Sequence, residues 1–205
     1  MNMDKPSLEA IGLNARINVM KFANQHLCAP KQDDFQNYND YEKNYDSYQA
    51  FYCYPGSRFP EWLEYKQSAK YSVIINLSSA PPSPVYGFIW CFVLVGEVNA
   101  HEFDIVISDC EGKGITDRVR MKLNHQYRLV GPHRVVVMYD QRCSDFLNNI
   151  ATGLTRFKIM VAWQVKESGR SLSLPKPFNT LLGFGVSIIR TSTYSSFVQQ
   201  IKEAR

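Results

Sequence analysis

The chain has 205 residues, of which 45% are hydrophobic and 20% are charged, a composition that excludes a chain disordered throughout. A domain of this length buries about 70% of the surface of its unfolded chain and needs neither disulfides nor a metal to fold. The net charge of +4 is unevenly divided: residues 1–50 carry five Lys and Arg against seven Asp and Glu, and residues 51–205 carry eighteen against twelve. A mildly basic globular part therefore follows an acidic segment, a balance that does not by itself indicate nucleic-acid binding.

The first predicted element is a helix near the N-terminus. Pro6 and Ser7 are typical of a helix start, and we expect Gly12 to interrupt the helix early, which leaves residues 14–27 as its firm part. Four apolar residues in that part recur at three- and four-residue spacing: Ile17, Met20, Ala23 and Leu27. We assign residues 1–30 to a helical connector. Its apolar stripe either folds back on the rest of the chain or stays exposed, and we expect deletion of residues 1–48 to improve solubility.

Residues 31–50 differ in composition from the rest of the chain. They are acidic and rich in tyrosine, and four of the tyrosines fall at helical spacing: Tyr38, Tyr41, Tyr45 and Tyr48. One interpretation is a polar linker whose tyrosines dock loosely, and the other is a short acidic helix that presents a tyrosine stripe to a partner. We treat the segment as a linker.

From residue 51 onward the pattern is that of β-structure. Seven short segments rich in β-branched and aromatic residues are separated by turn signals made of Gly, Pro, Asn and Ser. They predict strands at residues 71–77, 86–95, 103–108, 118–123, 134–139, 155–165 and 182–189. Because no long helical pattern separates them, parallel βαβ units are excluded. We predict an antiparallel two-sheet β-sandwich over residues 51–197, followed by a polar tail at 198–205.

Two of these strands have informative patterns. Residues 86–95 are apolar on both faces, which predicts a central strand covered on each side. The segment 118–123 alternates strictly, with Arg118, Arg120 and Lys122 on one face and apolar residues on the other. That alternation predicts a half-buried strand with one solvent-facing, basic face.

A search for catalytic or metal-binding patterns finds none with the required spacing. Residues 183–187 have the letters of a nucleophile elbow in the wrong order, and residues 112–114 lack the length and the Ser or Thr of a P-loop. The four histidines are isolated from one another, and the acids around residues 104–117 are typical of a solvated loop, with a weak calcium site as the alternative. We expect a protein that is not an enzyme and that uses no cofactor and no metal.

The five cysteines have at least 18 residues between any two, which excludes CxxC motifs and argues against a disulfide framework. The longest apolar run, residues 85–95, is too short to cross a bilayer, and charged residues interrupt the first thirty positions. We therefore expect a protein of the cytoplasm or nucleus that has no membrane partner.

The basic residues favour binding over catalysis. Lys113, Arg118, Arg120 and Lys122 are candidates for contact with an acidic protein partner, together with the loop 110–116. The alternative is a solvated strand face that binds nothing. Nucleic acid is not favoured, because the strand lacks interleaved aromatic residues and any nucleic-acid-binding motif.

Residues 53–63, here named the clasp segment, have an unusually specific pattern. Pro55 and Gly56 are typical of a tight turn, and Pro60 stiffens the chain after it. Trp62 then offers a large apolar surface that can anchor the segment against a sheet. We predict a structural role for these four residues at the start of the sandwich.

The clasp segment closely resembles the PGS-x-x-P-x-W opening of the C-terminal jelly-roll/Ig-like domain (C-JID) that follows the leucine-rich repeats of plant TIR-NB-LRR disease-resistance receptors. The resemblance continues in order and spacing through residues 72–77, 77–84 and 87–94. Residues 137–140 and 183–186 resemble later strands of tobacco mosaic virus resistance protein N-like members. Residues 7–27 are similar to the segment that joins the last repeat to this domain. The resemblance covers about residues 7–200 and implies a jelly-roll/Ig-like sandwich after a helical connector.

In such receptors the domain is not catalytic. The resemblance implies a recognition module that binds a pathogen effector together with the leucine-rich repeats, while NAD+ hydrolysis belongs to a TIR domain and nucleotide exchange to an NB-ARC module. This chain has neither a P-loop nor a leucine-rich repeat period.

The alternative function is a sandwich that binds a small ligand or a carbohydrate, for which Trp90, Trp163 and twelve tyrosines provide material. Trp90 and Trp163 lie within apolar strands, so we expect both in the core.

Overall fold

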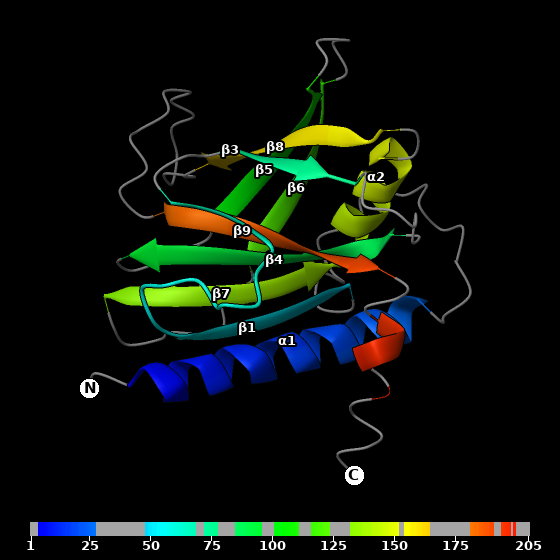
Figure 1. Cartoon of the computed structure of the whole chain (residues 1–205). Coiled ribbons are helices and arrows are strands. Elements are labelled where there is room, and N and C mark those ends of the chain that lie inside the picture. Colours follow the sequence, from blue (N-terminus) through cyan, green and yellow to red (C-terminus); the bar gives the residue numbers. More distant parts are fainter. Residues whose placement is uncertain are drawn as a thin grey trace.

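The computed structural model describes residues 4–27, 48–68, 72–77, 85–95, 101–110, 116–123, 132–151, 154–164, 181–190, 194–197 and 199. Over these ranges the chain forms two antiparallel sheets that pack face to face, with one helix lying on the outer face of the larger sheet (Figure 1). The elements are, in chain order, α1 (Lys5–Leu27), β1 (Gln49–Pro55), β2 (Tyr65–Ser68), β3 (Ser72–Asn76), β4 (Val85–Val95), β5 (His101–Asp109), β6 (Thr116–Leu123), β7 (His133–Asp140), α2 (Gln141–Ala151), β8 (Arg156–Gln164) and β9 (Leu181–Arg190).

The larger sheet, sheet A, has the strand order β1-β7-β4-β9-β2, and the smaller, sheet B, has the order β3-β8-β5-β6. All neighbouring strands are antiparallel. The predicted fold class, a mainly β two-sheet sandwich preceded by a helix, is confirmed, and all seven predicted strands are present. The strands β1 and β2 and the helix α2 were not predicted from the sequence. The sequence predicted only that no long helix separates the strands, and the 11-residue α2 between β7 and β8 is a short helix that this pattern did not reveal.

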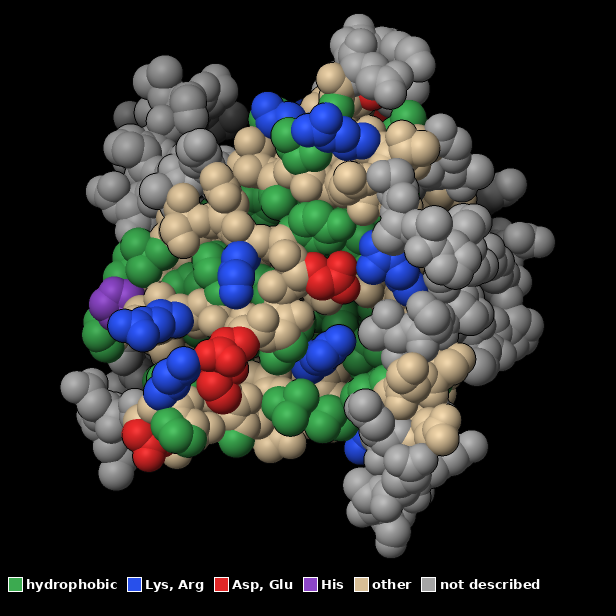
Figure 2. All heavy atoms as spheres, viewed as in Figure 1, with side chains coloured by type: hydrophobic (Ala, Val, Ile, Leu, Met, Phe, Trp, Pro, Cys, Tyr) green, Lys and Arg blue, Asp and Glu red, His purple; other side chains and the backbone are tan. Residues whose placement is uncertain are grey.

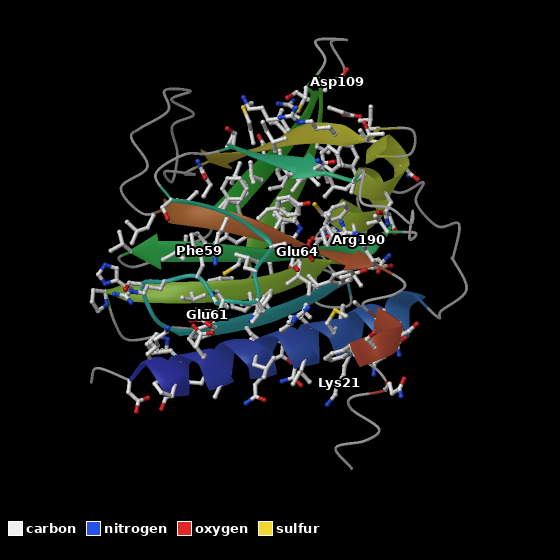
Figure 3. All side chains as sticks on the ribbon, in the orientation of Figure 1. Lys21, Phe59, Glu61, Glu64, Asp109 and Arg190 are labelled. Carbon is white, nitrogen blue, oxygen red and sulfur yellow. The ribbon has the colours of Figure 1, made fainter. Side chains whose placement is uncertain are left out.

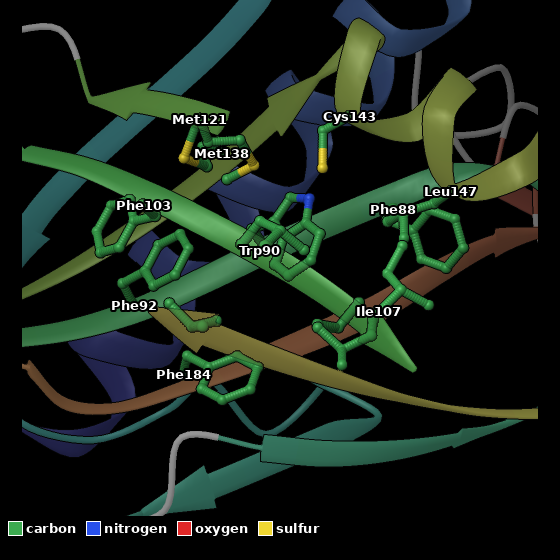
Figure 4. Close-up of a cluster of buried hydrophobic side chains, with 14 of the residues drawn as sticks. Phe88, Trp90, Phe92, Phe103, Ile107, Met121, Met138, Cys143, Leu147 and Phe184 are labelled. Atoms are coloured by element: carbon green, nitrogen blue, oxygen red, sulfur yellow. The ribbon is translucent and has the colours of Figure 1, made fainter. Parts of the chain in front are cut away.

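The inner core lies between the two sheets and is rich in aromatic residues. Trp90 and Phe92 of β4 are fully buried, and Phe92 stacks on Phe103 of the opposite sheet with ring centroids 4.4 Å apart. Helix α2 adds Cys143 and Leu147 at one end of this core (Figure 4). Burial of such large rings is the main stabilising contribution to the sandwich.

A second core lies between sheet A and α1. The residues of β4 that point away from the inner core, Ile89, Cys91 and Val93, are as fully buried as those that point into it. They are covered by α1, which crosses β1, β7 and β4 (Figure 1). The prediction that residues 86–95 form a central strand covered on each side is confirmed, and the helix is what covers its second face.

Helix α1 differs from its prediction in start and in buried stripe. It begins at Lys5, and Asp4 caps it by accepting a hydrogen bond from the Ser7 backbone N–H at 2.9 Å. Hydrogen bonds from Ser7 also hold the pKa of Asp4 below its usual value. The residues buried against sheet A are Ala15, Val19, Met20 and Ala23, whereas Ile17 is half-buried and the side chain of Leu27 lies outside the described residues.

The prediction that Gly12 interrupts the helix was wrong. Gly12 lies inside α1, where a Cβ would be 3.0 Å from the Tyr54 hydroxyl and 3.4 Å from Pro60. A glycine lowers helix propensity by about 1 kcal/mol, but here it lets the helix approach the sandwich closely. Tertiary packing therefore decides the conformation at this position.

Helix α2 is held at its first turn by Asp140, the last residue of β7. One carboxylate oxygen accepts a hydrogen bond from the Cys143 backbone N–H at 2.9 Å, and the other accepts from the side chains of Gln49 and Arg142. Asp140 is almost fully buried, so each of these bonds compensates for lost hydration. One residue thus caps α2 and ties it to the start of β1.

The docked helix reverses the expectation about solubility. Removing residues 1–48 would expose the apolar outer face of sheet A, including Val135 and Val137, so we now expect the deletion to reduce solubility.

A sharper test compares two substitutions on the same helix. Val19→Asp places a charge in the buried contact between α1 and sheet A. It should lower the free energy of unfolding by about 3 kcal/mol or more, as measured by denaturant titration. Leu13→Asp, at a position that is 49% exposed, should change it by less than about 0.5 kcal/mol. Equal effects of the two substitutions would mean that α1 is not docked as described.

Candidate functional site

The clasp segment lies on the outer face of sheet A, against α1. Its Trp62 indole N–H donates a hydrogen bond to the Gly12 carbonyl oxygen at 3.1 Å, and the Arg16 guanidinium lies over the Trp62 ring, 5.3 Å from its centroid. Burial lowers the pKa of Arg16, while Glu64 opposes that effect. A single aromatic side chain therefore links one turn of α1 to the sandwich through a hydrogen bond and a cation–π contact.

The clasp segment also contacts the first turns of α1. The Glu61 backbone N–H donates to the Glu9 carboxylate at 3.3 Å, and the Lys5 ammonium lies 2.8 Å from the Glu61 carboxylate (Figure 3). The hydrogen bond from Lys5 holds the pKa of Glu61 below its usual value. Both side chains of this ion pair are exposed, so it adds little to the free energy of unfolding. Its main effect is to orient the clasp segment relative to the first turn of α1.

The four helix residues that face the clasp segment share one stripe. They are Lys5, Glu9, Gly12 and Arg16. Their spacing of four, three and four residues places them one above the other on a 3.6-residue helix. The apolar residues of α1 that contact sheet A form a second stripe next to this one. Helix α1 is therefore held by two neighbouring stripes, one against the clasp segment and one against sheet A.

Two glycines of β9 allow the clasp segment and β2 to pack closely against this strand. A Cβ on Gly185 would lie 2.3 Å from the Leu63 side chain and 2.6 Å from the Tyr65 backbone oxygen. A Cβ on Gly183 would lie 2.6 Å from the Gln67 backbone oxygen and 2.9 Å from the Phe59 ring. The residues between and after them, Phe184 and Val186, point into the inner core. Alternating glycines therefore let one face of β9 accept close backbone contact while its other face fills the sandwich.

The four residues predicted to have a structural role lie at the end of β1 and in the turn that follows it, and Pro60 and Trp62 contact α1. Pro55 ends β1, and the Gly56 backbone N–H donates to the His133 carbonyl oxygen at 3.3 Å. Pro60 is buried, and Trp62 is half-buried against α1. The contact of Trp62 with α1 joins residues some fifty positions apart in the sequence, so no local pattern predicts it.

A neighbouring polar cluster is satisfied within the protein. The Glu64 carboxylate accepts hydrogen bonds from the Ser187 hydroxyl at 3.2 Å and from the Arg190 guanidinium at 3.4 Å (Figure 3). These side chains use their hydrogen-bonding capacity on one another, so the cluster is structural.

The basic face predicted for strand 118–123 belongs to β6, at the edge of sheet B. Arg118 and Arg120 are exposed, and Val119 and Met121 between and after them are partly and fully buried. The Lys122 side chain and the whole of Lys113 lie outside the described residues. Arg120 forms an ion pair with Asp104 of β5 at 3.0 Å, and Arg118 pairs with Val106 across the strands.

The outer face of sheet B continues from β6 across β5 and β8 to β3. The register gives three rows of neighbouring side chains: Arg120–Asp104–Ala162, Arg118–Val106–Met160–Ser72 and Ser108–Lys158–Ile74. Side chains in one row have Cβ atoms about 5 Å apart. Met160 of the inner strand β8 is 36% exposed and Ile74 of the edge strand β3 is 45% exposed, so an open apolar strip runs from the centre of this face to its β3 edge. Lys and Arg side chains gather at the top of the molecule over β8 (Figure 2).

Other candidate sites receive no support from the residues that the structure describes. Within those residues no group of His, Cys, Asp and Glu could hold a metal ion. Trp90, a candidate for ligand stacking, is fully buried, and the Trp163 side chain is outside the described residues. Burial raises the pKa of Cys53 to about 11 and also raises the pKa of Cys91 and Cys143, so burial favours the protonated thiol over the nucleophilic thiolate at these three cysteines.

The described helices also include none with the length and apolar character of a membrane-spanning segment. A scan of the sequence against models of known protein families finds no matching family, and a search of curated proteins likewise finds no match. The likeness to the C-JID therefore depends on the residues quoted above and on where they lie.

Trp62 provides the first test of the joint between α1 and the sandwich. Trp62→Phe keeps a ring but removes the N–H donor, and should lower the free energy of unfolding by about 1 kcal/mol. Trp62→Ala also removes the packing and the cation–π contact, and should cost about 3 kcal/mol in a denaturant titration. If Trp62→Ala were as stable as the unmodified chain, the joint would not be held through this side chain.

Gly185 provides the second test. Gly185→Ala should lower the free energy of unfolding by about 3 kcal/mol, because the added methyl group meets a backbone oxygen that cannot rotate away. Gly56→Ala is the matched control, since its Cβ would meet flexible side-chain atoms, the nearest being Val135 at 3.1 Å. A stability loss that is equal for both would show that the close contact at Gly185 is not specific.

Proposed function

We propose that this chain is a non-catalytic protein-recognition module of the C-JID kind, which contributes to recognition of pathogen effectors by a plant immune receptor. Its partners are an effector protein and the leucine-rich repeats of such a receptor, and it acts in the cytoplasm or nucleus without membrane or nucleic acid. The NAD+-hydrolysing activity of these receptors belongs to a TIR domain, so the proposal assigns no catalysis to this chain.

The observation that carries this proposal is the meeting of separate resembling stretches on one face of sheet A. Pro60 and Trp62 come from the PGS-x-x-P-x-W stretch, and Gly183 and Gly185 come from the stretch 183–186. The 137–140 stretch adds Val137 and Tyr139 to the same second core, and α1 contains residues 7–27, which resemble the connector. Residues that the C-JID pattern shares thus form one joint between helix and sandwich.

The joint has a direct consequence for recognition. Because the helix is docked on the sandwich, the sandwich keeps a fixed orientation relative to the part of a receptor that precedes the helix. A fixed orientation lowers the conformational entropy that is lost when a partner binds. In a receptor of this family, α1 would follow the last repeat. The outer face of sheet B would then point away from α1 and from the repeats.

The test measures direct binding by the purified chain. Biolayer interferometry against a panel of plant-pathogen effector proteins should give at least one complex with a Kd of about 1 μM or tighter. A glycan array should give none, and NAD+ incubated with the chain should stay intact. Binding to glycans alone would support the carbohydrate-binding alternative, and turnover of NAD+, or binding to no effector at all, would contradict the proposal.

A further inference from the structure

We infer that the outer face of sheet B docks an acidic protein surface that presents an apolar side chain at its centre. This deepens the proposed function, on which it rests only in taking the partner to be a protein. The outward side chains described on this face are Ser72, Ile74, Asn76, Asp104, Val106, Ser108, Arg118, Arg120, Arg156, Lys158, Met160 and Ala162.

The centre of the face is apolar. Met160 lies beside Val106 on the two inner strands, and Ile74 of the edge strand β3 lies diagonally from Met160 because Met160 pairs with Ser72 two residues before it. Two of the large hydrophobic side chains that the described chain exposes are therefore neighbours here, whereas Leu13 and Leu182 belong to α1 and β9. A flexible methionine at such a centre can fit several shapes of apolar partner.

The surround of that centre is positive. Arg118 borders Val106, and Lys158 lies between Ile74 and Ser108 in the neighbouring row. Asp104 is the one carboxylate among the outward side chains described on this face, and its charge is compensated by Arg120 at 3.0 Å. The charges that remain for a partner are those of Arg118, Arg156 and Lys158, which select for acidic surfaces.

The same features favour a protein over the other occupants. A second copy would bring its own positive surround against this one, which costs free energy for like charges. A single-stranded nucleic acid needs aromatic side chains on which bases stack, and the outward side chains described on this face include none. An acidic protein surface with a protruding apolar residue satisfies both the charge and the open apolar centre.

The experiment uses fluorescence anisotropy of a short labelled peptide in which Asp and Glu residues flank two leucines. The full chain should bind it, and binding should weaken as salt is raised, because exposed charges are screened. A peptide with serines in place of the leucines should bind more weakly, and one with Lys and Arg in place of the acids should not bind. These measurements need no variant of the protein.

Matched substitutions locate the binding. Lys158→Glu should weaken binding of the peptide about tenfold, and Met160→Ser about threefold. Lys21→Glu makes the same charge change at an exposed position of α1, on the opposite side of the molecule (Figure 3). It should leave binding of the peptide unchanged. Each variant should keep its melting temperature within about 2 °C of that of the unmodified chain.

Several outcomes would overturn the inference. They are equal weakening by Lys21→Glu and Lys158→Glu, tighter binding of an oligothymidine than of the acidic peptide, and a dimer in sedimentation that Met160→Ser dissociates. The proposed function fails separately: an effector that binds equally well to Lys158→Glu would leave recognition in place and remove this face from it.

Discussion

The structure depends on one constraint, which is that sheet A must be buried on both of its faces. Its central strands β4 and β7 have apolar residues pointing both ways, so a sandwich alone would leave Ile89, Val93 and Val135 in water. Helix α1 covers them, and small residues such as Ala15 and Gly12 let it lie close to the sheet. The clasp segment then fills the space between α1 and β9, where glycines remove the side chains that would otherwise block it. Helix, clasp segment and sandwich are therefore one cooperative unit.

Two parts of the surface differ in character, the surface over the clasp segment and the outer face of sheet B. On the face that includes the clasp segment, positive and negative side chains lie next to one another (Figure 2), and Lys5 and Glu61 form an ion pair there. The outer face of sheet B has exposed apolar side chains with a positive surround instead. The first surface serves the fold, and we propose that the second serves recognition. Edge strands often carry Lys and Arg only to prevent strand pairing, but that role does not account for the exposed apolar side chains of Met160 on the inner strand β8 and of Ile74 beside it on β3.

Much of the fold was predictable because local sequence patterns determine strands. Alternation and β-branched residues identified seven strands, and the two-faced apolar pattern of β4 was interpreted correctly. The short polar β2 and the tyrosine-rich β1 lack such patterns, and α2 was missed although Asp140 and the spacing of Cys143, Leu147 and Ile150 are helix signals. At the site, alternation predicted the exposure of Arg118 and Arg120. Their neighbours Met160 and Ile74 depend on the register between strands far apart in the sequence, which no local pattern contains.

Pulse alkylation with peptide mass spectrometry tests the central claim most directly. Cys91 lies under α1 and Cys143 lies in the inner core, and burial raises the pKa of both thiols, so each reacts only when its cover opens. If α1 and the sandwich are one cooperative unit, the two cysteines become modified at the same slow rate, set by global unfolding. Modification of Cys91 much faster than of Cys143 would show that α1 opens independently and would contradict the account.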